Sequence, residues 1–154
     1  MQQISLGAAA GSALLLIAAL LFQYAGGLAP CPMCIWQRWP HGVAILAGIG
    51  MLVLPMRAWA LLGAGAMAVN AGLGGYHTGV ERGWWPGPDS CTAPDLGAMD
   101  AGALVDQLLA TEVVLCDEVA WQIFGLSMAS WNALASLALA LLWLRAYASS
   151  SASQ

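Results

Sequence analysis

The sequence predicts an all-α membrane protein, a four-helix transmembrane bundle with a short amphipathic interfacial helix in its second extracytoplasmic loop. The chain is 60% hydrophobic and 8% charged, with no lysine, whereas a soluble domain carries about 25% charged residues. Four apolar stretches approach or exceed the length that crosses a bilayer core of roughly 30 Å. All eight acidic residues fall between positions 81 and 118, which marks that segment as solvated. No basic stripe suggests nucleic-acid binding.

The apolar stretches set out the expected order of spans and loops. The expected spans cover about residues 4–22, 32–54, 58–75 and 123–144. Two outer loops, about 23–31 and 76–122, complete a single membrane domain of residues 1–148, and residues 149–154 form a flexible tail. The first stretch lacks the charged start and the cleavage site of a signal peptide, so we expect it to be retained.

Charge and cysteine placement together predict the orientation. An even number of spans places both termini on one side, together with Arg57 and Arg145, and basic residues favour the cytoplasmic side. The CxxC turn and the second outer loop share the opposite face and hold all four cysteines, and persistent disulfides need an oxidising compartment. We therefore expect both termini in the cytoplasm and both cysteine-bearing loops outside it.

Apolar residues recur at near-helical spacing within the second loop. They are Leu104, Val105, Leu108, Leu109 and Val113. An amphipathic helix lying on the membrane surface explains this pattern, because the acidic residues between them would face water. Such a helix would hold the loop cysteines near the first cysteine pair.

Cys31 and Cys34 form a CxxC pair at the mouth of the second expected span. Pro32 suits the first turn of a helix, which places both thiols at a helix N-terminus. The helix dipole there favours the thiolate, the reactive form of cysteine. Arg38 follows Cys34 by one turn on the same face and can reach its sulfur. An arginine at this depth is costly and usually functional, although an interfacial anchor is the alternative.

Cys91 and Cys116 lie in the only polar part of the chain, and two structural interpretations stand beside a redox one. A plain loop disulfide would stabilise the protein by about 3 kcal/mol. A four-thiolate zinc site across both pairs is the other, but the spacing is a poor match to a zinc ribbon. His41 and His77 are lone histidines near span ends, where hydrogen bonding is commoner than catalysis.

Several local runs occur in an order that resembles the disulfide bond formation protein B family (DsbB), thiol oxidases of the bacterial inner membrane. The runs are Cys31-Pro-Met-Cys34-Ile-Trp-Gln-Arg38, Tyr76-His77-Thr78, Cys116-Asp-Glu, Trp121, Phe124-Gly-Leu126 and Met128. The resemblance covers nearly the whole chain. A CxxC alone would be weak evidence, but this ordered set is specific.

The resemblance implies a protein-dithiol:quinone oxidoreductase that generates disulfides. A periplasmic thioredoxin-fold carrier of the DsbA type would attack a Cys91–Cys116 disulfide, and the freed Cys116 would exchange with Cys31. Cys34 would then pass electrons to a membrane quinone, ubiquinone or menaquinone, bound near Arg38 and His77. The implied redox disulfides are Cys31–Cys34 and Cys91–Cys116, with no metal. The implied location is the inner membrane, with the redox loops in the periplasm.

Some residues depart from this pattern and leave other functions open. Gln37 stands where some family members have an acid, and Trp84-Trp85 makes an aromatic approach to Cys91 that suits either the membrane interface or a docked partner. The chain could therefore be a dedicated paralogue that serves one specialised carrier or client. A non-enzymatic membrane protein with one structural disulfide and a thiolate metal-binding protein are the remaining alternatives.

Overall fold

A computed structural model describes residues 1–91 and 114–149 of the chain. The amphipathic helix expected around 104–113 lies outside the described residues and stays a prediction. The expected tail also lies outside them, apart from Ser149, which ends the last helix.

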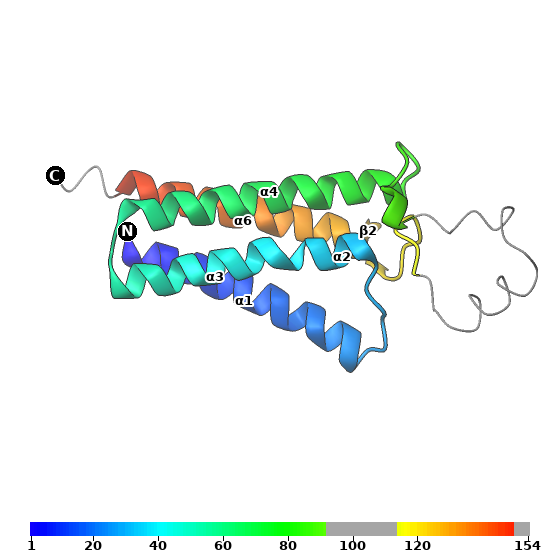
Figure 1. The fold of residues 1–154 in the computed structure, drawn as a ribbon, viewed down its shortest axis with the longest axis horizontal. Coiled ribbons are helices and arrows are strands. Elements are labelled where there is room, and N and C mark those ends of the chain that lie inside the picture. The colour runs from blue at the N-terminus through cyan, green and yellow to red at the C-terminus, as the bar shows by residue number, and fades with distance from the viewer. Residues whose placement is uncertain (92–113, 150–154) are drawn as a thin grey trace, which may run out of the picture.

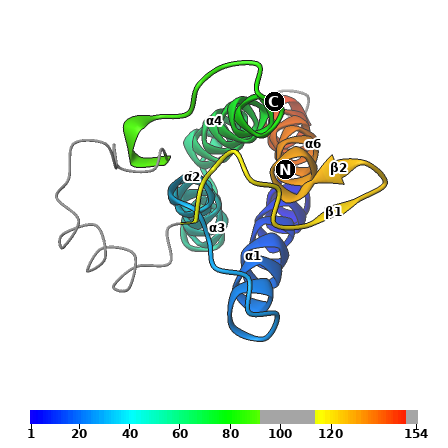
Figure 2. The same cartoon turned by 90° about the vertical axis from the view of Figure 1, so that its right-hand side faces the viewer.

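The described residues form a bundle of long helices that lie side by side (Figure 1). The elements are α1 (Gln2–Tyr24), α2 (Pro32–Trp36), α3 (Arg38–Val53), α4 (Arg57–Glu81), the 3₁₀ turn η1 (Asp89–Cys91), β1 (Gln122–Ile123), β2 (Leu126–Ser127) and α6 (Met128–Ser149). Viewed along the bundle, α1 packs against α3 and α6, and α4 also packs against α3 and α6 (Figure 2). The four long helices thus close a ring around one core. The start of α1 and the end of α6 lie at the same end of the bundle (Figure 1).

Within residues 1–91 and 114–149, three helices, α1, α4 and α6, are long and apolar enough to cross a membrane. They confirm the expected class, a mostly helical membrane protein. The second expected span, 32–54, is divided, because α2 ends at Trp36 and α3 begins at Arg38, so that α3 has 16 residues. Gln37 between them keeps right-handed helical angles, with φ −68° and ψ −14°. The two helices therefore follow one another along one axis (Figures 1 and 2).

The ends of α4 and α6 differ from the expected span limits for local reasons. α4 continues past Gly75 to Glu81 and ends in a Schellman motif, where Gly83 has φ +67° and the Trp84 N–H donates to the Gly79 carbonyl at 2.9 Å. α6 begins only at Met128, because residues 122–127 pair as the β1–β2 hairpin. The hairpin turns at Phe124 and Gly125, both with positive φ.

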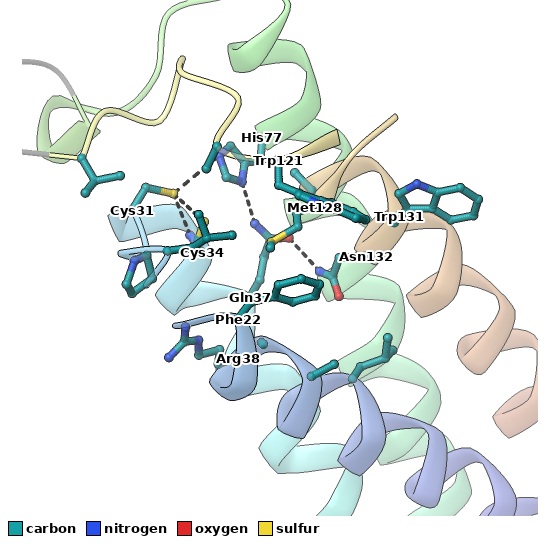
Figure 3. Close-up of a pocket in the computed structure, with 18 of the residues that line it drawn as sticks. Phe22, Cys31, Cys34, Gln37, Arg38, His77, Trp121, Met128, Trp131 and Asn132 are labelled. Atoms are coloured by element: carbon teal, nitrogen blue, oxygen red, sulfur yellow. Dashed lines mark hydrogen bonds between the residues drawn. The ribbon is translucent and has the colours of Figure 1, made fainter. Parts of the chain in front are cut away.

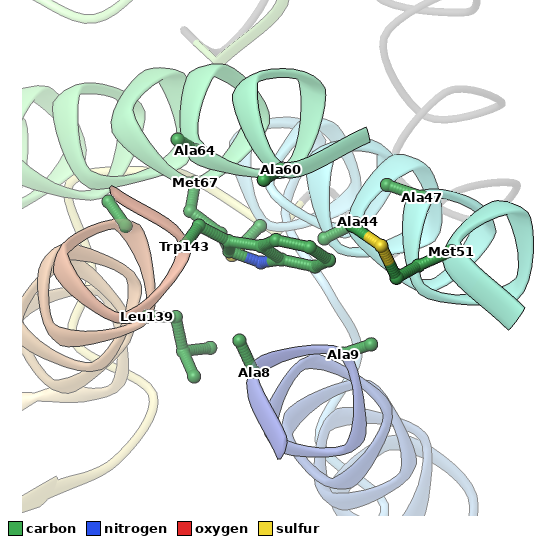
Figure 4. Packing of buried hydrophobic residues seen from close by; sticks show 11 residues of the cluster. Ala8, Ala9, Ala44, Ala47, Met51, Ala60, Ala64, Met67, Leu139 and Trp143 are labelled. Carbon is green, nitrogen blue, oxygen red and sulfur yellow. The ribbon is translucent and has the colours of Figure 1, made fainter. Parts of the chain in front are cut away.

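The core of the bundle consists mostly of alanines packed around a few large side chains, and many large apolar residues lie on the outer surface of the helices. Its buried alanines are Ala8, Ala9, Ala44, Ala47, Ala60, Ala64 and Ala140. Leu14, Leu46 and Leu141 point outward instead and are more than half exposed. The fully buried Trp143 of α6 lies among these alanines (Figure 4). Close packing of small residues is how membrane helices associate, because lipid is as apolar as leucine.

The close approach of α4 to Trp143 yields a stability prediction. A Cβ atom added at Gly63 would overlap the indole of Trp143, whereas one added at Gly65 meets nothing within 4 Å. Gly63→Ala should therefore lower the free energy of unfolding by about 1–3 kcal/mol, the usual cost of overpacking. Gly65→Ala, the matched control, should leave it unchanged or raise it, because alanine favours helix. Reversible unfolding in detergent measures both, and equal stability of the two variants would contradict the packing described here.

Candidate functional site

The CxxC pair opens α2 as the sequence predicts. Cys31 is the N-cap residue and Pro32 occupies the first turn, so the backbone N–H of Cys34 donates to Cys31 Sγ at 3.2 Å. The two sulfurs lie 2.7 Å apart as free thiols, with Cys31 as the donor. The hydrogen bond to Cys34 and then burial raise the pKa of Cys31 far above its usual value. Cys31 therefore keeps its proton and donates it in the hydrogen bond to Cys34.

The second cysteine pair lies directly against the first. Cys91 and Cys116 are joined in a disulfide, and both are buried with Cys31 in one small cluster that includes Val80 of α4. The Sγ atoms of Cys31 and Cys116 lie within 4.8 Å of one another and of a His77 ring nitrogen. Segments far apart in the sequence thus bring all four cysteines to one end of the bundle.

This cluster also bears on the zinc alternative. Cys31, His77 and Cys116 have the spacing of a metal-ligand set, but the thiolate is the form of cysteine that binds metal. Cys116 is committed to its disulfide in this structure. A zinc site across both pairs would therefore require that this disulfide be reduced first.

His77 lies in the last turns of α4 and is tied to both sides of the site. Its Nε2 lies 3.6 Å from Cys31 Sγ, and its Nδ1 lies 2.8 Å from Nε2 of Gln37. Gln37 also donates to the Met33 carbonyl at 3.1 Å and accepts from Asn132 of α6 at 2.7 Å (Figure 3). The side chain at the junction of α2 and α3 thus connects α4 with α6. Sequence analysis noted Gln37 only as a departure from the family and missed this contact.

Arg38 lies beside the CxxC pair but is anchored to α1. Its Nη1 donates to Gln23 Oε1 at 2.7 Å, while its buried Nε has no hydrogen-bond partner among the described residues. Gln23 is a second residue that sequence analysis missed. The expected contact of Arg38 with the Cys34 sulfur remains a prediction. Both residues line the same cavity.

A cavity of about 400 Å³ opens next to Cys34. Its apolar walls come from α1 and α6, and a segment with Trp121 closes it near Phe22, with ring centroids 5.4 Å apart (Figure 3). The polar groups that line it include Cys34, Gln37, Arg38, His41, His77 and Glu81. A mostly apolar pocket of this size with a few converging polar groups is typical of a small-molecule site.

Two further polar contacts lie around this cavity. Glu81, at the end of α4, accepts a short hydrogen bond from the Ser127 hydroxyl. His41 on α3 lies 2.9 Å from the Asn132 amide oxygen and 3.0 Å from the Asn70 amide nitrogen. Buried polar groups need partners, and these contacts supply them between helices. Glu81 was expected only to be solvated, and its place beside the cavity was not predicted.

The aromatic approach to Cys91 forms an ordered turn. Trp85 stacks on Tyr76 with ring centroids 5.8 Å apart, and its indole N–H donates to the Tyr76 carbonyl at 2.9 Å. Trp84 is 62% exposed, with the Arg82 guanidinium 5.4 Å from its ring. The turn therefore presents two exposed tryptophans shortly before Cys91 in the sequence, of which Trp85 is held by stacking and a hydrogen bond.

Comparison with known proteins gives a consistent assignment. The sequence model of the family described as disulfide bond formation protein DsbB matches residues 2–146. A protein of Dechloromonas aromatica named disulfide bond formation protein B is 36% identical over 120 residues, which cover 70% of this chain and 68% of the relative. A protein of Polaromonas sp. with the same name is 32% identical over 137 residues, covering 84% and 80%. No solved structure matches the chain. The resemblance seen in the sequence is confirmed, and the chain belongs to the DsbB family of membrane proteins for disulfide bond formation.

Proposed function

We propose that this chain is a dithiol:quinone oxidoreductase, which reoxidises a periplasmic thioredoxin-fold carrier of the DsbA type and passes the electrons to a membrane quinone. The observation that carries the proposal is the position of Cys31. Its sulfur contacts Cys34 on one side and lies within 4.8 Å of Cys116 on the other. Cys34 in turn lines the apolar cavity. A continuous path thus joins the loop disulfide to a site for an apolar molecule.

The proposed topology has four spans in the bacterial inner membrane, with α2 and α3 together forming the second span of one domain, residues 1–148. The start of α1, the end of α6 and Arg57 lie at the end of the bundle opposite the cysteines (Figure 1). Basic residues favour the cytoplasmic side. Both termini then face the cytoplasm and the redox loops face the periplasm, where disulfides persist.

The first exchange steps follow from the positions of the sulfurs. A carrier thiolate attacks Cys91, the Cys91–Cys116 bond breaks, and Cys116 leaves as a thiolate. Cys116 then attacks Cys31 of the oxidised CxxC pair, so that the new bond is Cys31–Cys116 and Cys34 leaves as a thiolate. Each step exchanges one disulfide for another, so no electrons are lost or gained until the terminal acceptor is reached.

The cavity fits a quinone in its polarity and in its donors. Apolar residues of α1 and α6 suit a ring with a lipid tail, and Arg38 brings a positive charge with an Nε that has no partner in the described part of the chain. Arg38 and His77 would hold the quinone beside Cys34, and His77 and the backbone hold Cys31 in place. When bound, a quinone accepts two electrons and two protons. The protein positions the quinone and provides charged groups beside it. Ubiquinone and menaquinone both meet this description.

A dedicated paralogue is the second candidate, and the ordered Trp84–Trp85 turn favours it. The exposed Trp84 lies only a few residues before Cys91, and aromatic residues are enriched where proteins bind partners. A carrier that approaches Cys91 would meet this side chain. Exchange rates with several carriers, compared between the wild type and Trp84→Ala, distinguish a general oxidase from a dedicated one.

Quinone reduction by the purified chain tests the proposed function directly. With a reduced DsbA-type carrier, the wild-type chain should turn over quinone, and Cys34→Ser should abolish turnover because the terminal thiol is gone. The same variant should still form a mixed disulfide with the carrier through Cys91. Undiminished quinone reduction by Cys34→Ser would refute the assigned path.

The position of Cys31 between two sulfurs predicts which interloop disulfide forms. In the double variant Cys34→Ser, Cys91→Ser, the remaining Cys31 and Cys116 should oxidise to a disulfide, because their sulfurs lie within 4.8 Å. The matched control Cys31→Ser, Cys91→Ser leaves Cys34 with Cys116 and should cross-link far more slowly. Peptide mapping of the non-reduced proteins by mass spectrometry measures both, and equal yields would show that Cys31 is not the exchange partner.

Arg38 should matter for quinone affinity and not for thiol exchange. Arg38→Met removes a charged hydrogen-bond donor, a loss of about 1.5–3 kcal/mol, so the KM for quinone should rise about tenfold or more. The single-turnover rate of exchange with the carrier should stay the same and serves as the control. An unchanged KM would reduce Arg38 to an anchor for Gln23 of α1.

A further inference from the structure

We propose that Gln37 and Asn132 are positioning residues, which hold the His77 ring in the tautomer that carries its hydrogen on Nε2 and directs it at Cys31 Sγ. The arrangement is a chain of buried side chains from α6 through the α2–α3 junction to α4 (Figure 3). The effect of this tautomer on disulfide exchange at Cys31 rests on the relay proposed above. The tautomer itself does not depend on that relay.

The orientation of the Gln37 amide is determined by its neighbours. Its Nε2 lies 3.1 Å from the Met33 carbonyl, which can only accept a hydrogen bond. The opposite orientation would place two oxygens in contact there. Its Oε1 then faces the Asn132 amide nitrogen at 2.7 Å, which donates. Gln37 is buried, so each of these groups needs its partner inside the protein.

The Gln37 amide in turn determines the tautomer of His77. Gln37 Nε2 lies 2.8 Å from His77 Nδ1, so this ring nitrogen must accept and carries no hydrogen. A neutral imidazole then has its hydrogen on Nε2. That nitrogen lies 3.6 Å from Cys31 Sγ, and its N–H has a second acceptor in the Cys116 backbone carbonyl. The N–H of His77 therefore points at the junction of the two cysteine loops.

The directed N–H has a chemical use in the step that closes the relay. The second carrier thiol first attacks its partner sulfur in the carrier–Cys91 mixed disulfide, so that the oxidised carrier leaves and Cys91 is freed as a thiolate. That thiolate attacks Cys116 in the Cys31–Cys116 disulfide, the Cys91–Cys116 bond forms again, and the electron pair leaves on Cys31 Sγ. Two N–H groups then surround the new thiolate, from the Cys34 backbone at 3.2 Å and from His77. A better-stabilised leaving thiolate speeds disulfide exchange. A ring with the hydrogen on Nδ1 would present a lone pair to this sulfur instead.

The tautomer can be measured directly because the chain has only two histidines, His41 and His77. We would label the full-length chain with ¹⁵N-histidine and record the ring nitrogens at about pH 8, where a free imidazole is neutral. His77 of the wild type should carry its hydrogen on Nε2 alone. Gln37→Glu keeps the shape but replaces the donor by an acceptor, so His77 should gain a hydrogen on Nδ1. Ser12→Ala removes a buried hydrogen bond from α1 to the Met67 sulfur of α4, outside this chain of contacts, and should leave the His77 signals as in the wild type.

Alkylation of Cys31 measures the consequence of the tautomer for the sulfur. In a background with Cys34, Cys91 and Cys116 changed to serine, Gln37→Leu should slow alkylation about two- to tenfold, the value of one neutral hydrogen bond. A wild-type hydrogen on Nδ1, or an unchanged tautomer in Gln37→Glu, would overturn the assignment of Gln37. An unchanged alkylation rate would overturn its effect on Cys31. Neither measurement uses a quinone or a carrier, so a failed quinone assay would refute the proposed function and leave this result standing.

Discussion

Helices inside a bilayer gain nothing from burying leucine, because the surrounding lipid is equally apolar, and this constraint shapes both ends of the bundle. At one end α1, α3, α4 and α6 approach closely through alanines around the buried Trp143. At the other end they are joined by hydrogen bonds between side chains: Gln37 with His77 and with Asn132, and Asn132 with His41. Polar contacts that hold membrane helices together are thus the same contacts that build the site. A substitution among them affects helix packing and chemistry together.

The divergence of α1 from the other helices at the cysteine end accompanies the cavity described above. The helix diverges there from its neighbours (Figure 1), and the space is bordered by the cavity-lining residues of α1 and α6. The Phe22–Trp121 ring contact and the Gln23–Arg38 hydrogen bond span the gap. The cavity beside Cys34 therefore lies between the diverging end of α1 and α6.

Local patterns predicted the parts of this molecule that depend on neighbours in sequence. Pro32 placed the CxxC pair at a helix start, and apolar length identified the helices α1, α4 and α6. The Schellman end of α4 also had a local signal in Gly83, although the span was ended earlier at Gly75. The Gln37–His77 contact joins residues 40 apart. No periodicity or spacing encodes such a pair, because its formation depends on how whole helices pack.

Exchange between disulfides releases little free energy per step, since 30 mV corresponds to about 1.4 kcal/mol for two electrons. In the proposed relay the protein therefore cannot drive electrons by its own sulfur potentials, and the terminal acceptor must supply the driving force. The contribution of the fold to this relay is the order in which the four sulfurs react. Cys31, Cys91 and Cys116 are buried in one cluster, and the Cys31 sulfur lies between those of Cys34 and Cys116. Cys31 donates its hydrogen to Cys34, which lines the cavity. In the proposed relay, the positions and hydrogen bonds of the sulfurs thus decide which sulfur acts at each step, although no step is strongly downhill.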